Sequence, residues 1–79
     1  MDWRDYIAAD PGVLAGKPAI KGTRVSVELI LNRLADGWTR EDLLEAYPRV
    51  SSDALQAVFA FAAEVMKDEE YVARGKLMA

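Results

Sequence analysis

The sequence predicts a mainly α-helical single domain over residues 1–79, with a three-helix, helix-turn-helix-like core, a β-containing N-terminal arm and a short C-terminal helix. Three observations support this fold class. A chain of 79 residues has room for only one domain. Three of the five glycines and two of the three prolines fall within residues 1–25, whereas apolar residues recur at helical spacing almost throughout the rest. The expected parts are therefore an arm at 1–25, a core at 26–66 and a C-terminal segment at 67–79.

The arm is expected to hold one or two short extended segments, around Asp5–Ala8 and Ala19–Val25, between glycine-marked turns. The first helix is expected to begin after Ser26, whose hydroxyl suits an N-cap, and to run to about Ala35. Gly37 then supplies the left-handed residue that commonly ends a helix.

A second, short helix is predicted to open at Thr39, where Asp42 stands in the position that completes a capping box. This helix must end before Pro48, because proline disfavours the α conformation of the residue preceding it. Ser51 or Ser52 is expected to cap a third helix that continues to at least Met66. Residues 68–74 either extend this helix or turn back on it.

The composition excludes several classes of chemistry. The chain has neither cysteine nor histidine, so disulfides, zinc fingers, thiol catalysis and Ser-His-Asp triads are ruled out. The acidic clusters at 41–45 and 68–70 lack the alternating spacing of a calcium loop. We therefore expect no metal, no cofactor, no small-molecule substrate and no enzymatic activity.

The hydropathy pattern predicts no membrane association. The longest apolar run, residues 57–63, is far shorter than the roughly 20 residues of a membrane span. The N-terminus lacks the pattern of a signal peptide, so a cytoplasmic location is expected.

A local basic stretch stands out against the net charge of −3. Between Asp10 and Glu28 there are three positive charges and no negative one, which favours contacts with phosphates. Five basic side chains and three hydroxyls form the predicted DNA-binding set: Lys17, Lys21, Thr23, Arg24, Arg40, Arg49, Ser51 and Ser52. The same patch is also compatible with a solvated surface, or with a contact to the acidic half of a second chain.

The third helix carries apolar side chains on two sides. One stripe is expected to be core and comprises Leu55, Val58, Phe59, Ala62 and Met66. A second comprises Ala54, Ala57, Phe61 and Val65. A helix that is apolar most of the way round needs cover on more than one side. Either the arm, through Trp3, Tyr6 and Ile7, or a second copy supplies it. We expect a homodimer that buries Ala57, Phe61 and Val65.

Residues 7–63 resemble the family catalogued as domain of unknown function 433. The resemblance rests on the run Gly16-Lys17-Pro18-Ala19-Ile20-Lys21-Gly22-Thr23-Arg24-Val25, followed by Leu34-Ala35-Asp36-Gly37-Trp38-Thr39, Leu43-Leu44 and Tyr47-Pro48. Ala15-Gly16 replaces the usual pair of glycines before the lysine. The resemblance implies a helix-turn-helix-type domain and an antitoxin role, paired with a PIN-like ribonuclease toxin.

The leading interpretation is a non-catalytic antitoxin-like regulator that neutralises such a toxin and binds operator DNA. The alternative is a small homodimeric interaction module with no nucleic-acid role. The C-terminal segment would engage the toxin with Tyr71 and Val72 as apolar anchors, and with Arg74 directed at the carboxylates of the nuclease. A terminal helix whose charges are simply solvated explains the same pattern.

Overall fold

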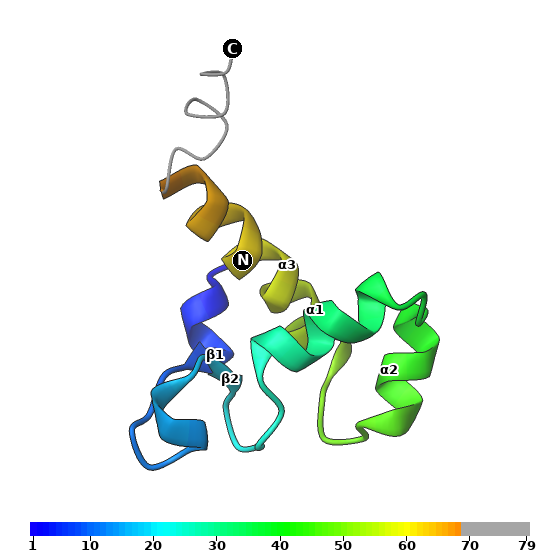
Figure 1. Ribbon diagram of the computed structural model, residues 1–79, viewed down its shortest axis with the longest axis horizontal. Helices are drawn as coiled ribbons and strands as arrows, with labels where there is room; N and C mark the ends of the chain where they lie inside the picture. The colour runs from blue at the N-terminus through cyan, green and yellow to red at the C-terminus, as the bar shows by residue number, and fades with distance from the viewer. Residues whose placement is uncertain (69–79) are drawn as a thin grey trace.

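The computed structural model describes residues 1–68, which form a small helical domain with an N-terminal β-hairpin (Figure 1). The arm contains two 3-10 turns and two strands. The core contains three α-helices, as the sequence predicts. The elements in chain order are η1 (Trp3–Asp5), β1 (Ile7–Ala8), η2 (Leu14–Gly16), β2 (Ala19–Ile20), α1 (Val27–Ala35), α2 (Arg40–Ala46) and α3 (Ser52–Asp68).

The two strands pair antiparallel, with Ile7 opposite Ile20 and Ala8 opposite Ala19. Both extended segments are shorter than the sequence suggests. Asp5 belongs to η1, and the chain turns directly after Ile20 because Gly22 adopts a positive φ of 78°. The Thr23 hydroxyl donates a hydrogen bond to the Ile20 carbonyl over 2.8 Å, which closes this turn and ends the strand.

The ends of α1 follow the predicted local chemistry. The Ser26 hydroxyl accepts a hydrogen bond from the Leu29 amide at 2.9 Å and caps the N-terminus. At the C-terminus, Gly37 has a φ of 96°, and the Trp38 amide donates to the Arg33 carbonyl. This is a Schellman motif, so α1 ends at Ala35 as expected.

The predicted caps of α2 and α3 are also present. Thr39 and Asp42 form the reciprocal pair of a capping box, with side chain-to-backbone distances of 3.1 and 2.9 Å. The Ser51 hydroxyl, rather than that of Ser52, accepts from the Ala54 amide and caps α3. Within residues 1–68, no helix combines the length and apolar composition that crossing a membrane requires.

The core lies between the hairpin and the three helices. Its fully enclosed large side chains are Ile30, Leu43, Leu55 and Val58. The prediction that the first stripe of α3 belongs to the core is only partly confirmed. Leu55 and Val58 are buried, but Phe59 and Met66 are 39% and 50% exposed. The reason is that the buried face of α3 takes part of each predicted stripe, Leu55 and Val58 from the first and Ala54 and Ala57 from the second.

Candidate nucleic-acid interface

A shallow groove of about 290 Å³ lies between two loops that are distant in sequence. One loop precedes α1 and the other connects α2 to α3, and both lie along the lower edge of Figure 1. The side chains that line this groove are Thr23, Arg24, Val25, Ala46, Tyr47, Pro48 and Arg49. We call it the basic groove, because two guanidinium groups and no carboxylate border it.

Backbone hydrogen bonds hold the first loop in place. The Lys21 amide donates to the Tyr6 carbonyl at 2.8 Å, and the Ile20 amide donates to the Val25 carbonyl at 3.0 Å. The Thr23 hydroxyl donates to Ile20 and also accepts from the Val25 amide at 3.0 Å. Thr23 therefore shapes the turn with its hydroxyl, while the side chains of Lys21 and Arg24 remain exposed.

The second loop is anchored through Tyr47. Its ring stacks on Trp38 with ring centroids 6.4 Å apart, and its hydroxyl accepts a hydrogen bond from Arg33 at 3.3 Å. The Val50 amide closes the loop by donating to the Tyr47 carbonyl at 2.9 Å. These contacts fix the backbone around Arg49, whose side chain is exposed at the rim of the groove.

Three exposed cations at this end form no ion pair within residues 1–68: Lys21, Arg24 and Arg49. Other basic side chains of this part of the chain are engaged internally. Lys17 contacts Glu28 at 3.2 Å, and Arg40 donates to the carbonyl and the hydroxyl of Ser52 at 3.1 and 2.8 Å. A cation without an internal partner gains most from an external anion, so these three define the candidate site.

The structure thus separates the eight predicted DNA-binding residues into two groups. Thr23, Arg24 and Arg49 line the basic groove, and Lys21 lines a neighbouring hollow that shares Thr23 and also includes Asp10. The other four serve the fold elsewhere, because Lys17 pairs with Glu28, Arg40 ties α2 to Ser52, and Ser51 caps α3. Sequence reasoning could not distinguish the groups, since the partner of Arg40 lies 12 residues away.

The residues predicted for a dimer interface do not share one free surface. Ala57 is fully buried within a single chain, so it offers no area to a second copy. Phe61 packs against Trp3 of the arm, with the ring centroids 4.8 Å apart and the planes at 83°. Val65 is 36% exposed. The predicted toxin contacts Tyr71, Val72 and Arg74 lie outside the described residues.

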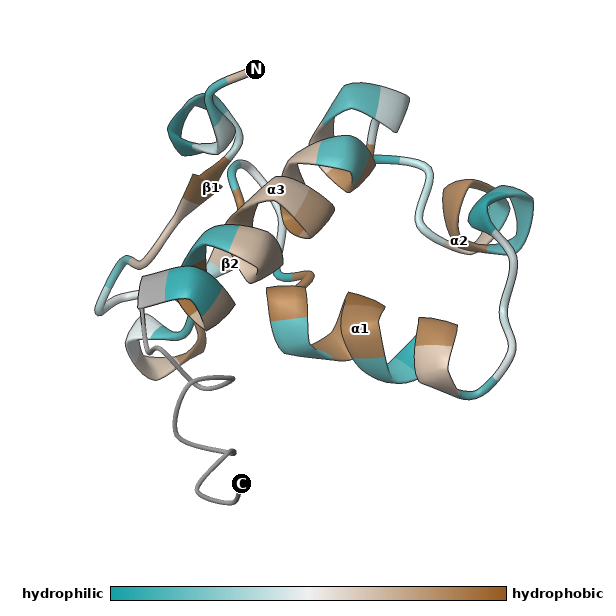
Figure 2. Ribbon diagram, turned by 90° about the horizontal axis from the view of Figure 1, so that it is seen from above, coloured by the Kyte–Doolittle hydropathy of each residue, from teal (hydrophilic) through white to brown (hydrophobic). Residues whose placement is uncertain are grey.

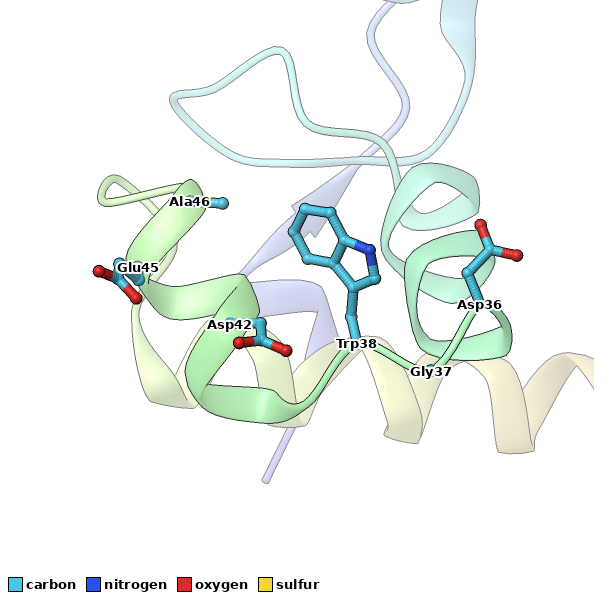
Figure 3. A pocket seen from close by; sticks show the side chains of 6 residues that line it. All are labelled: Asp36, Gly37, Trp38, Asp42, Glu45 and Ala46. Carbon is cyan, nitrogen blue, oxygen red and sulfur yellow. The ribbon is translucent and has the colours of Figure 1, made fainter.

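A second hollow of about 380 Å³, which the sequence did not suggest, lies between the end of α1 and the helix α2 (Figure 3). The Trp38 side chain stands between the end of α1 and the helix α2, and three carboxylates border it: Asp36, Asp42 and Glu45. Within residues 1–68 no group of such side chains is placed to hold a metal ion. The three carboxylates make this hollow unfavourable for a phosphate.

Comparison with known proteins places the chain in a family. The family described as protein of unknown function (DUF433) matches residues 7–62, and the chain therefore belongs to it. The uncharacterized protein y4eO of Sinorhizobium fredii is 30% identical over 59 residues, which are 75% of this chain. The chain spans only 27% of the length of that relative.

The fold has also been seen in a solved structure. The crystal structure of a DUF433 member protein from Anabaena variabilis superposes with a TM-score of 0.73 at 25% sequence identity. The match covers 90% of this chain and 67% of the other. The mainly helical fold with an N-terminal hairpin is thus the fold of a DUF433 member.

Proposed function

We propose that this member of the DUF433 family is a non-catalytic, antitoxin-like regulator whose basic groove binds the phosphates of operator DNA. One observation carries the proposal: Lys21, Arg24 and Arg49 are exposed at one end of the domain and form no ion pair within residues 1–68. An acidic protein needs such a local patch, because its net charge of −3 gives no general attraction to DNA.

The groove suits phosphate recognition chemically. Arg24 and Arg49 come from separate loops and border a single hollow, and a guanidinium can bind a phosphate through two parallel hydrogen bonds. Lys21 adds a third charge from the turn that holds Arg24. Contacts of this kind position a protein on DNA without reading its sequence.

Neutralisation of a toxin forms the second part of the proposal. It rests on the resemblance to antitoxins paired with PIN-like ribonucleases, and the net charge of −3 complements a partner that binds RNA. The segment at 67–79 would make the contact, with Tyr71, Val72 and Arg74 as its principal side chains. Co-expressing the toxin with a chain truncated after Asp68 tests this part, since the truncated chain keeps α3 but should no longer silence the toxin.

A second candidate function is an interaction module without any nucleic-acid role. The exposed Phe59 and Met66 on α3 favour it, because such side chains mark a surface suited to another protein. The two functions differ in whether DNA is retarded at low salt.

Mobility shift on the DNA upstream of the protein's own reading frame tests the groove. The double variant Arg24→Ala/Arg49→Ala should bind about 100-fold more weakly, at roughly tenfold per charge-assisted contact. Lys17→Ala is the matched control, because Lys17 is an exposed cation already paired with Glu28, and it should bind nearly as well as the parent.

The salt dependence gives an independent measure. Three neutralised phosphates predict that the logarithm of the binding constant falls with a slope of about −2.7 against the logarithm of salt concentration. The double variant should flatten that slope to about −0.9. No retardation at low salt, with or without the toxin, would remove DNA from the function.

A further inference from the structure

We propose that α3 pairs with α3 of a second copy of the chain, antiparallel, through the face that the fold leaves uncovered. The α3 seam, as we name this face, consists of Asp53, Gln56, Ala60, Ala63 and Lys67, with Phe59 and Met66 along one flank. This surface differs from the one predicted from the sequence, and the inference holds whether or not the groove binds DNA.

The seam is open in a single chain. Gln56, Ala63 and Lys67 are exposed, and Phe59 and Met66 keep 39% and 50% of their surface in solvent. Figure 2 shows α3 lying across the molecule, with no other element between it and the viewer. The core packs against the other side of the helix through residues such as Leu55. η1 contacts Phe61 and Glu64, and so borders the seam along the flank opposite Phe59 and Met66.

The spacing along the seam suits helix pairing. Asp53, Ala60 and Lys67 are each seven residues apart, and so are Gln56 and Ala63. Residues at this spacing fall on one side of a helix, because seven residues complete nearly two turns. The two alanines lie near its centre, and small side chains let two helices approach to about 8 Å between axes.

The charges on the seam select the partner and its direction. An acid, Asp53, and a base, Lys67, stand 14 residues apart, or about 21 Å at the rise of an α-helix. A two-fold axis through Ala60 places Asp53 beside Lys67 of the second copy, and repeats that contact at the other end. A parallel pair would instead bring Asp53 against Asp53 and Lys67 against Lys67. The seam is therefore complementary to itself only when the helices run antiparallel.

The apolar flank agrees with this arrangement. In an antiparallel helix pair, the same flank of each helix meets the same flank of the other. Phe59 and Met66 of both copies would then lie on one side of the seam and cover each other, while the charged pairs lie on the opposite side. The two groove loops lie along the lower edge of Figure 1, and α3 rises from the second of them toward the top.

Charge reversal on the full chain tests the pairing. Light scattering at about 100 µM should give the parent chain twice 8.7 kDa. Asp53→Lys and Lys67→Asp should each be monomeric, because each one sets two like-charged contacts at the seam. When the two variants are mixed in equal amounts, both contacts become attractive, and a one-to-one heterodimer should form.

Two further variants keep the result decisive. Glu45→Lys is the matched control, because it reverses an exposed acid on α2 that forms no ion pair within residues 1–68, and it should remain dimeric. Ala63→Glu places a charge at the centre of the seam on an exposed position, and it should be monomeric with an unchanged helical circular dichroism spectrum. A monomeric parent chain overturns the proposal. So does a mixture of the charge variants that yields no heterodimer.

Discussion

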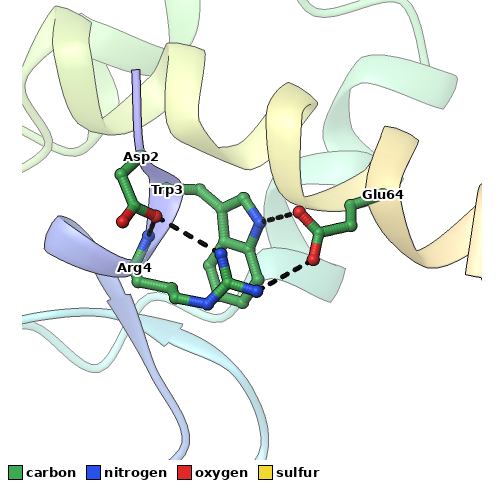
Figure 4. Close-up of polar contacts among 4 residues, drawn as sticks. All are labelled: Asp2, Trp3, Arg4 and Glu64. Carbon is green, nitrogen blue, oxygen red and sulfur yellow. Dashed lines mark hydrogen bonds and ion pairs between the residues drawn. The ribbon is translucent and has the colours of Figure 1, made fainter.

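The two faces of α3 differ in what the rest of the chain does for them. On one face the N-terminal arm is held by an aromatic contact and by polar contacts, in which Glu64 accepts from the Trp3 indole and from the Arg4 guanidinium, each at 2.9 Å (Figure 4). On the other face Phe59 and Met66 are 39% and 50% exposed. Both faces of α3 carry large apolar side chains. The position of the arm, rather than the hydropathy of the helix, therefore decides which face is buried.

This difference shows how a short arm completes a small domain. The arm begins with 3-10 turn η1, whose Trp3 reaches across to a residue 61 positions further along the chain. Arg4 adds an ion pair to Glu64, but both side chains are largely exposed, so the pair contributes little by itself. The aromatic contact and the buried edge of the hairpin therefore account for most of the attachment.

The largest expected effect is a difference in stability between alanine variants of two phenylalanines that lie two positions apart on α3. Removing a fully buried phenylalanine costs about 3–5 kcal/mol, and the partly covered Phe61 should cost about 2 kcal/mol when replaced by alanine. Phe59→Ala should cost less, about 1 kcal/mol at low micromolar concentration, because Phe59 is already 39% exposed. Urea unfolding followed by circular dichroism measures both.

Protein concentration should change the stability loss of one variant and not that of the other. If a second copy covers Phe59, the loss caused by Phe59→Ala should grow as the protein concentration rises, whereas that of Phe61→Ala should not. Equal losses for the two variants at low concentration would contradict the assignment of the faces.

A smaller effect is expected for the polar part of the arm contact. Trp3→Phe keeps a ring against Phe61 but loses the indole hydrogen bond to Glu64, which should cost about 1 kcal/mol. Trp38→Phe is the matched control, because the indole nitrogen of this second half-buried tryptophan has no hydrogen-bond partner within residues 1–68. A loss as large for Trp38→Phe as for Trp3→Phe would show that ring size, not the hydrogen bond, matters.

The smallest effect is a dependence of stability on pH. The hydrogen bond from the Trp3 indole, followed by the contacts with Arg4, lowers the pKa of the Glu64 carboxyl, although partial burial acts in the opposite direction. The pKa of a glutamate in an unfolded chain is about 4.3. The stabilisation by Glu64 is therefore complete above that pH, and it is lost as the pH falls through the lower pKa of the folded state.

Denaturant midpoints between pH 7 and pH 3 test this sign. The parent should lose more stability below about pH 4.3 than Glu64→Gln does, because glutamine has no proton to gain. Asp2 also has a lowered pKa, chiefly from its hydrogen bond with the Arg4 backbone, and it titrates in both proteins. Parallel profiles for the two proteins would show that Glu64 contributes nothing to the acid response.

The ends of the helices were predictable because their chemistry is local. Ser26, Gly37 and the pair Thr39 and Asp42 act on backbone groups within a few residues, so their spacing in the sequence already defines their contacts. The length of β2 was not predictable in this way. The glycine and threonine after Ile20 turn the chain where alternation alone favoured a longer strand.

All members of the candidate site were in the set predicted from the sequence, but only Lys21 and Arg24 could be placed together on local grounds. Lys21 and Arg24 are neighbours in one turn, and the absence of acids around them marks the patch. Arg49 joins Arg24 only because the loop after α2 folds back beside the loop before α1, 25 positions earlier. The sequence did not distinguish Arg40 from these residues, but its guanidinium donates a hydrogen bond to Ser52 across the junction of α2 and α3.

By itself the sequence determined where α1 and α2 begin and end, that the arm contains short extended segments, and that one stretch of it is basic. Only the tertiary structure decided which face of α3 is buried, which cations are left without an internal partner, and which surface is open to a second copy. The physical reason is that capping and turn formation depend on neighbours in the chain. The burial of an apolar face or the pairing of a charge instead depends on groups that the fold brings together from 12 to 61 positions away.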